Sequence, residues 1–312
     1  MILTLNEDFD IIRKASSTVL CNELSKCVYE GHKKDSKRNY KIDDRMICIF
    51  KFLYKVRFAT KEQINRYLNI NGYLSISEKF LNVLNMKYGC ISIIDIKNNK
   101  TNSRIYVPAL GMLYILDKYS NLEINENTDE YNFQQHINNS LINGDQNKIK
   151  KGLILTELYL NLIEKCKSEV VYLENRIKVK QFIKDDIDNE YISFKCDLLA
   201  SFNMKDDIQS YFIKYIDKEY EIRRAVELLN NFNIFVKDEE LVDRYCEISY
   251  KKPKLVIICE DDDFMQDLFN TIIHYDLDFN NICLSCLDVL FKDNKDELFT
   301  VEEVFLDISD YI

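Results

Sequence analysis

Two hydrophobic runs in the second half of the chain each carry one charged residue that could do chemistry. Asp197 interrupts the run YISFKCDLLASF (191–202), and Lys214 interrupts the run SYFIKYID (210–217). Both runs have the composition of buried strands. Metal-dependent nucleases place an acid and a lysine on neighbouring strands, because carboxylates hold Mg²⁺ and the lysine positions the attacking water.

The residue two positions before the lysine decides how strongly this pattern predicts catalysis. A nuclease of this kind needs a metal-binding acid there, and the chain has Phe212. Asp217 would supply that acid only if a one-residue β-bulge at Tyr215 turned it toward Asp197. Glu157 would be a further ligand if the helix predicted over 147–166 presented it to the sheet.

The two charges also have an explanation that needs no metal. Opposite charges on neighbouring strands can satisfy each other inside a protein. Asp197 and Lys214 are therefore interpreted as a structural pair or a vestige of a nuclease site. The alternatives are a contact with DNA or a protein partner, and catalysis. No cofactor or metal site is expected, except Mg²⁺ under the catalytic alternative.

The elements around these residues alternate between helix and strand. The predicted order is a helix over 147–166, strands over 169–179, 191–202 and 208–217, helices over 218–232 and 239–250, a strand over 254–260, a helix over 261–275, and strands over 281–291 and 300–308. This succession is typical of the restriction-endonuclease-like, or PD-(D/E)XK, fold. The second half is therefore predicted to be an α/β domain with a mixed sheet.

The first half has the pattern of a winged helix-turn-helix. Helices are predicted over 43–56 and 59–68, and a third over 73–88 with Ser75 and Glu78 as its capping box. The buried stripe of the third helix is predicted to be Ile76, Phe80, Val83 and Leu84, and its stop Gly89. Alternating runs over 90–96 and 103–110 predict a hairpin, and 111–119 a closing helix.

In a winged helix the third helix enters the major groove and the hairpin contacts the backbone of DNA. The outward face of the third helix is predicted to present Ser75, Lys79, Asn82 and Asn85 to DNA, and the wing to present Lys97, Lys100 and Arg104 to phosphates. The alternative is a winged helix that binds another protein and whose lysines are merely solvated.

The distribution of charge favours the DNA-binding interpretation. Residues 1–118 hold 20 Lys and Arg against 12 Asp and Glu, a balance of +8, and the other 194 residues hold 22 against 40, a balance of −18, which together give the net −10. A basic part attracts phosphates, and an acidic part limits indiscriminate binding to nucleic acid.

The same composition predicts the domain plan and the compartment. The plan is an N-terminal helix over 6–31 and a basic connector within 1–42, the winged helix over 43–120, a linker over 121–146 and the α/β domain over 147–312. No run is long and apolar enough to span a membrane, and the first residues lack the order of a signal peptide. Ten cysteines scattered in apolar runs suggest free thiols, so a cytoplasmic protein without membrane contact is expected.

The chain as a whole resembles the replication-relaxation family, in which a winged helix precedes an endonuclease-like domain. The resemblance lies in SRIYVPALG, FQQHINN, KCDLLASF, SYFIKYIDKEYE and KPKLVIIC, which occur in family order. It implies binding to double-stranded DNA in the replication or transfer of a plasmid or other mobile element. The family's third-strand motif reads Glu-x-Asp, and here Lys214 and Ile216 take those places. The family's histidine would be His136, for which a helix-capping or hydrogen-bonding role is expected.

These observations predict a non-catalytic, sequence-specific protein that binds double-stranded DNA. Its nuclease-like domain is expected to support a homodimer or to recruit a replication or transfer protein. One alternative is a metal-dependent endonuclease that uses Asp197, Lys214, Asp217 and Glu157. Another is a winged-helix transcriptional repressor.

Overall fold

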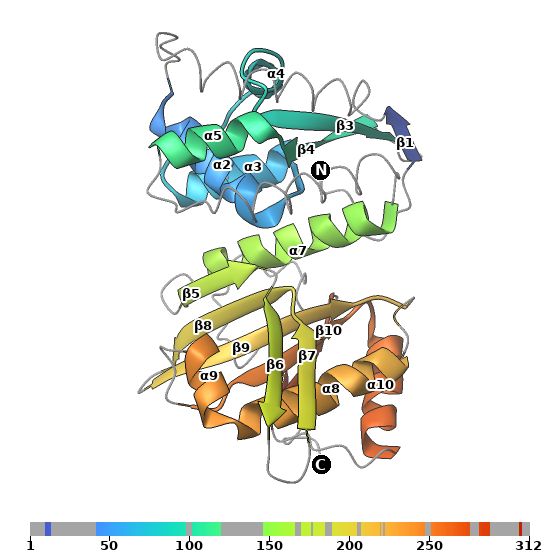
Figure 1. Ribbon diagram of the computed structural model, residues 1–312. Helices are drawn as coiled ribbons and strands as arrows, with labels where there is room; N and C mark the ends of the chain where they lie inside the picture. The colour runs from blue at the N-terminus through green and yellow to red at the C-terminus, as the bar shows by residue number, and fades with distance from the viewer. Residues whose placement is uncertain are drawn as a thin grey trace. The chain divides into compact units, whose positions relative to one another are not determined.

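A computed structural model describes residues 10–13, 42–97, 102–119, 146–165, 170–175, 177–184, 189–204, 207–218, 220, 222–246, 251–274, 281–287 and 306–307. The chain divides into two compact units, Met1–Leu160 and Asn161–Ile312, called unit 1 and unit 2 below (Figure 1). No helix within the described ranges is long and apolar enough to cross a membrane. His136, Lys100 and most of 1–42 lie outside these ranges.

The first two helices of unit 1 confirm the prediction. Helix α2 (Asp44–Val56) buries six apolar side chains, those of Met46, Ile49, Phe50, Phe52, Leu53 and Val56. Helix α3 (Lys61–Ile70) follows the short strand β2 (Ala59–Thr60) and begins with a capping box. Gln63 N donates to Thr60 Oγ1 at 3.2 Å, and Thr60 N donates to Gln63 Oε1 at 3.0 Å.

Helix α4 (Glu78–Met86), the third helix, starts later than predicted. Its N-cap is Ser77, whose hydroxyl accepts a hydrogen bond from Phe80 N at 3.4 Å, so Ser75 is not part of a capping box. The predicted stop is confirmed: Gly89 has a positive φ of 60°, which glycine adopts without strain, and its N–H donates to Asn85 O at 3.1 Å.

The buried face of α4 also differs from the predicted stripe. Leu81 and Leu84 are buried, whereas Val83 is 38 % exposed and Phe80 is half-buried. Five of the nine residues in α4 are apolar, so hydropathy alone does not single out the pair that faces the core. Because Leu81 and Leu84 face the core, the apolar side chains of Val83 and Met86 lie on the outer face of α4.

The predicted hairpin closes unit 1 as a winged helix-turn-helix. Strands β3 (Ile91–Lys97) and β4 (Asn102–Pro108) pair antiparallel in continuous register, and helix α5 (Leu110–Tyr119) follows. The sheet has the order β1-β3-β4-β2, with β1 at Asp10–Arg13. A helix was expected across these four residues; they form a strand because their two isoleucines suit a sheet and β3 offers them a free edge.

Helix α7 (Gln146–Lys165) contributes its residues up to Leu160 to unit 1. Thr156 Oγ1 donates to Phe58 O at 2.6 Å, and a Cβ on Gly152 would overlap the Phe58 ring. The expectation that the whole of this helix belongs with the α/β domain is therefore wrong. When a helix is apolar on most sides, its sequence does not indicate which other element it packs against.

Unit 2 is built on a six-stranded mixed sheet in the order β12-β11-β10-β9-β8-β5. The strands are β5 (Val170–Asn175), β8 (Leu198–Met204), β9 (Asp207–Ile216), β10 (Lys254–Cys259), β11 (Ile282–Cys286) and β12 (Leu306–Asp307). β10 runs parallel to β9 and β11, and the other neighbouring pairs are antiparallel. The prediction of an α/β unit with a mixed sheet is confirmed.

Two of the predicted strands are each split in two. The run 169–179 forms β5 and the start of β6 (Lys178–Lys184), and the run 191–202 forms the end of β7 (Asn189–Lys195) and then β8. Strands β6 and β7 pair only with each other among the described strands, as a separate hairpin. Asp197 therefore lies at a break between two strands and not within one.

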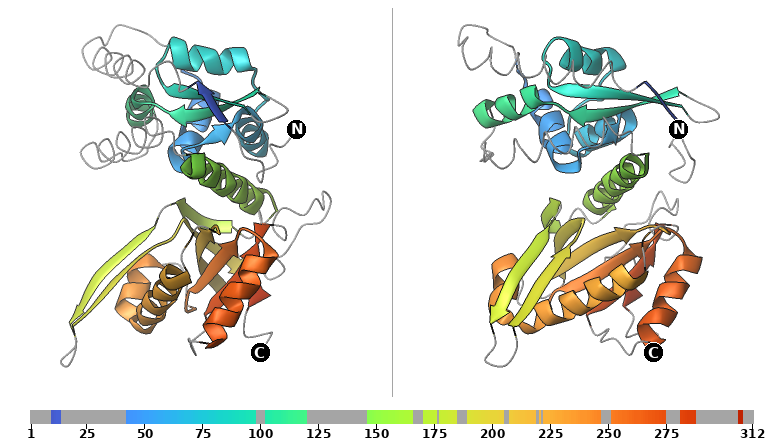
Figure 2. Two further views of the ribbon diagram at one scale, coloured as in Figure 1. Left: turned by 90° about the vertical axis from the view of Figure 1, so that its right-hand side faces the viewer. Right: turned by 45° about the vertical axis from the view of Figure 1, so that its right-hand side comes forward.

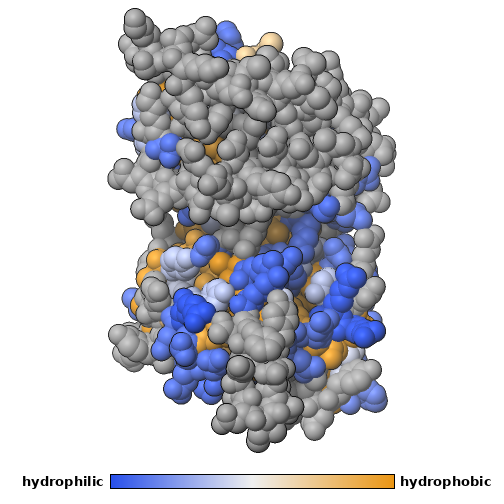
Figure 3. Space-filling view, in the orientation of Figure 1, coloured by the Kyte–Doolittle hydropathy of each residue, from blue (hydrophilic) through white to orange (hydrophobic). Residues whose placement is uncertain are grey.

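One face of the sheet, three helices and the inner side of this hairpin share a single core. The helices are α8 (Ile222–Lys237), α9 (Glu239–Tyr245) and α10 (Asp262–His274). Figure 2 shows α8 and α9 in the space between the sheet and the hairpin. On the outer side, hydrophilic residues cover the part of the hairpin nearest the sheet (Figure 3), and Lys178, Lys180 and Lys195 are exposed there.

Candidate functional site

The outer face of α4 in unit 1 is the first candidate site. Lys79, Val83 and Met86 are exposed on α4 at helical spacing, and the exposed C-cap Lys87 lies four residues after Val83; we call these four residues the α4 stripe. Met86 is 86 % exposed, and Val83 is 38 % exposed. The stripe thus combines two ammonium groups with two apolar side chains.

The turn before α4 is held by side chains of α3. Asn65 accepts a hydrogen bond from Ile76 N at 2.7 Å and donates to Ile76 O at 3.3 Å. The exposed Ser75 hydroxyl donates to Asn69 Oδ1 at 3.3 Å. Because Ser75 and Ile76, just before the N-cap Ser77, are hydrogen-bonded to α3, the start of α4 is held at a defined position against α3.

The two predicted asparagines of α4 are engaged within unit 1. Asn85 is half-buried and donates to Ile91 O at 2.7 Å, so its amide ties α4 to β3. Asn82 is half-buried and accepts from Arg104 Nη1 at 3.4 Å. Lys79 is the predicted residue of α4 whose side chain extends into solvent without a described ion pair.

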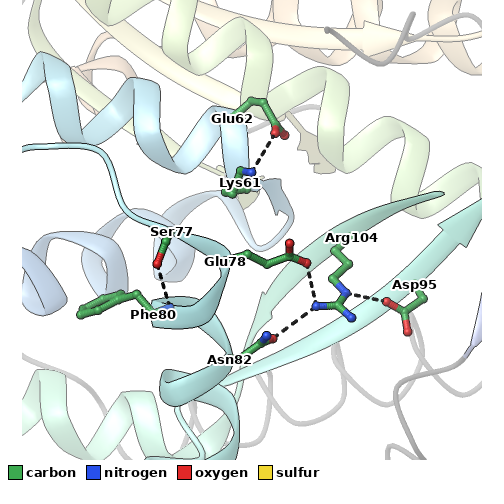
Figure 4. Close-up of polar contacts among 8 residues, drawn as sticks. All are labelled: Lys61, Glu62, Ser77, Glu78, Phe80, Asn82, Asp95 and Arg104. Atoms are coloured by element: carbon green, nitrogen blue, oxygen red, sulfur yellow. Dashed lines mark hydrogen bonds and ion pairs between the residues drawn. The ribbon is translucent and has the colours of Figure 1, made fainter. Parts of the chain in front are cut away.

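Arg104, predicted to reach phosphates from the wing, instead forms ion pairs with two acids of its own unit (Figure 4). Its Nη1 donates to Glu78 Oε1 at 2.7 Å, and its Nε donates to Asp95 Oδ1 at 3.0 Å. Asp95 is its direct partner across the β3–β4 ladder. Arg104 therefore joins the start of α4 to the hairpin, and its one positive charge is shared between Glu78 and Asp95. Of the other wing residues, Lys97 ends β3, and Lys100 lies outside the described residues.

Three residues of this surface were missed by the sequence analysis. Val83 was assigned to the core, and Met86 and Lys87 were not considered. A signal for them exists, because Lys79, Val83 and Met86 are spaced four and three residues apart. This spacing identifies an exposed face only once Leu81 and Leu84 are known to be buried.

The second candidate site is the predicted pair of unit 2, which the structure brings together. Lys214 Nζ lies 3.6 Å from Asp197 Oδ1, and the two side chains are 12 % and 14 % exposed. Asp197 Oδ2 also accepts a hydrogen bond from Tyr215 N at 2.9 Å, and Asp197 N donates to Ile213 O at 2.8 Å. The carboxylate thus continues the β8–β9 ladder by one bond where β8 begins.

Asp217 does not join this pair. The pairing of β9 with β10 is continuous from Tyr211 to Ile216, so the bulge at Tyr215 that would turn Asp217 toward Asp197 is not present. Asp217 is two residues after Tyr215, so continued alternation places it on the face of Tyr215, opposite to that of Lys214. Burial, with the charges of Glu260 and Asp217 nearby, raises the pKa of the Tyr215 hydroxyl.

The place of the metal-binding acid is filled by an aromatic cluster. Phe212 is fully buried, and its ring centroid lies 5.9, 5.8 and 5.3 Å from those of Phe194, Phe232 and Phe235. Within the described part of the chain, no three His, Cys, Asp or Glu side chains gather closely enough to hold a metal ion. These residues do not fit Mg²⁺, since a phenyl ring offers no ligand and Lys214 already faces the carboxylate.

Glu157, the remaining acid of the nuclease alternative, contacts side chains of α3 within unit 1. Its carboxylate forms an ion pair with Arg66 and accepts from Gln63 Nε2 at 3.1 Å. The structure therefore gives Glu157 partners of its own within unit 1. In unit 2, Asp197 and Lys214 lie together and Asp217 does not join them.

Comparison with known proteins adds little to this geometry. No protein-family model matches the chain. Protein PFC0760c of Plasmodium falciparum (isolate 3D7) is 27 % identical over 285 residues, which are 89 % of this chain and 6 % of that protein. The chain thus spans a small part of that relative's length, and the relative's name states no activity.

Proposed function

We propose that this protein binds double-stranded DNA through unit 1 without cleaving it. The observation that carries the proposal is the α4 stripe: two lysines and two apolar side chains exposed on the helix that winged helix-turn-helix proteins insert into the major groove. The ion pair with Arg104 offsets part of the charge of Glu78, the one acid of α4, and so reduces its repulsion of phosphates.

The absence of cleavage is supported by unit 2. Phe212 occupies the position of the third-strand acid, and Asp197 is committed to Lys214 and to the backbone of β9. A nuclease would need these groups to bind a metal and water. The proposed role of unit 2 is to support a homodimer or to recruit another protein.

The resemblance to the replication-relaxation family suggests where such binding would act. The proposed setting is the replication, transfer or control of a plasmid or mobile element, in the cytoplasm. A transcriptional repressor would use the same surface and would differ only in the DNA site that it occupies.

The salt dependence of binding tests the proposal. Anisotropy of a labelled duplex, titrated with the full chain in EDTA between about 50 and 200 mM KCl, should give an affinity that falls steeply with salt. Each phosphate contact contributes roughly 0.9 to the slope of log affinity against log salt, so Lys79→Gln with Lys87→Gln should lower the slope by about 2.

A matched control separates local contacts from net charge. Lys178→Gln with Lys180→Gln removes the same charge from exposed strand positions of unit 2 and should leave the slope unchanged. Equal weakening by both pairs would mean that net charge alone governs binding. Failure of the wild-type chain to bind would remove the proposal.

A further inference from the structure

We propose that Val83 and Met86 contact the 5-methyl groups of thymines in the major groove, so that the protein prefers sites with thymine facing α4. The inference rests on the proposed function and names what the α4 stripe reads. It starts from an unusual surface: three large apolar side chains, Leu74, Val83 and Met86, are exposed on α4 or in the turn before it.

The asparagine side chains of α4 form hydrogen bonds within unit 1, so they are not available to recognise bases. Asparagine reads adenine by a bidentate bond, but Asn85 donates to Ile91 O and Asn82 is held by Arg104. Arginine and lysine read guanine; α4 contains no arginine, and the exposed Lys79 and Lys87 are assigned above to phosphates. What remains on the outer face is the α4 stripe.

Thymine presents the one apolar group in the major groove, and apolar side chains recognise it by excluding water from the methyl. Val83 and Met86 are three residues apart, so their side chains are neighbours on the helix surface. Lys79 and Lys87 flank them, and the basic balance of residues 1–118 favours a polyanion over an acidic or neutral protein as the occupant.

The test removes the methyl group and nothing else. The full chain first selects duplexes from a random pool, and the selected duplex is then made again with deoxyuridine in place of thymidine. Burial of one methyl group corresponds to about a fourfold change in affinity, so loss of two contacted methyls should weaken wild-type binding by roughly fifteenfold.

Variants assign the effect to the α4 stripe. Val83→Ala with Met86→Ala should bind the thymine duplex more weakly than wild type does, and should bind the thymine and uracil duplexes almost equally. Ile273→Ala, which removes a 49 % exposed apolar side chain from a helix of unit 2, should keep the full wild-type preference for thymine.

Each contrary outcome has a distinct meaning. Equal wild-type affinity for the two duplexes would overturn the inference and leave DNA binding standing. Unchanged DNA affinity in the double variant would also overturn it and assign the apolar part of the stripe to a protein partner. No binding to any duplex would overturn both this inference and the proposed function.

Discussion

The pair in unit 2 allows the clearest separation of a structural from a catalytic role. The perturbation is Asp197→Ala. It removes the acceptor of Tyr215 N and leaves the Lys214 ammonium, whose side chain is 12 % exposed, without its carboxylate. Both losses destabilise the folded state, because each leaves a largely buried group unsatisfied.

The size of the effect follows from these two contacts. A hydrogen bond to a charged group contributes about 1.5–3 kcal/mol, and removing one partner of a buried pair costs roughly 3–5 kcal/mol. Since the pair keeps some exposure and its ions are 3.6 Å apart, we expect about 3 kcal/mol for Asp197→Ala. Adding Lys214→Met should restore about 1–2 kcal/mol, because it removes the unpaired charge.

Hydrogen exchange measures this loss in unit 2 separately from unit 1. A loss of about 3 kcal/mol corresponds to roughly a hundredfold faster exchange in peptides that cover β8 and β9. Peptides from α2 should exchange as in the wild type. Lys195→Ala, which removes an exposed charge two residues away, is the control and should leave all of these rates unchanged.

A different pattern would refute this reasoning. If Asp197→Ala exchanged like the wild type, the carboxylate would not stabilise the sheet. If the same variant also lost a Mg²⁺-dependent nicking activity that the wild type possessed, the pair would be catalytic, and the aromatic cluster around Phe212 would not have abolished the site.

Three further predictions concern the contacts that hold each unit together. Arg104→Ala should lower the free energy of unfolding of unit 1 by about 1 kcal/mol, without changing the salt slope of DNA binding; a slope lower by about 0.9 would mean that it contacts a phosphate. Glu157→Gln should cost unit 1 about 1–3 kcal/mol through the loss of its ion pair with Arg66, measured by hydrogen exchange of α3, and an effect confined to unit 2 would contradict this. The hydrogen-bonded Lys218 ammonium lowers the pKa of the Asp261 carboxyl, so the stabilisation by Asp261 is present above its unfolded pKa of about 3.9 and is lost as the pH falls through the lower folded value. Asp261 Oδ1 also accepts a hydrogen bond from Phe264 N at 3.0 Å at the start of α10, and loss of such a cap costs about 1 kcal/mol. Asp261→Ala should cost about that much in urea unfolding at neutral pH, and the difference from wild type should shrink toward about pH 3. A difference that stayed constant would exclude the charge as its cause.

Much of unit 1 could be predicted because local signals and packing agree there. The capping box of Thr60 and Gln63 and the stop at Gly89 depend on residues close in sequence, and both are present. The outer face of α4 could not be predicted, since its five apolar residues allow more than one buried face. Packing against the rest of unit 1 selects Leu81 and Leu84.

In unit 2 the type of each element was easier to predict than its ends. The run 191–202 is continuous in hydropathy, yet it changes partners at Asp197, where β7 leaves its hairpin and β8 joins the sheet. Pairing between strands distant in sequence decides such a break, and periodicity does not report it. The same limit applies to Glu157, whose partner Arg66 lies 91 residues away.

The central claim, DNA binding without cleavage, is tested most directly with a supercoiled plasmid. The full chain is incubated with it in Mg²⁺, Mn²⁺ or EDTA, and the products are resolved for both mobility shift and nicking. The account predicts a salt-sensitive shift that is the same in EDTA and in metal, with the plasmid still supercoiled after the protein is removed. Nicking that requires metal and is lost in Asp197→Ala would contradict it.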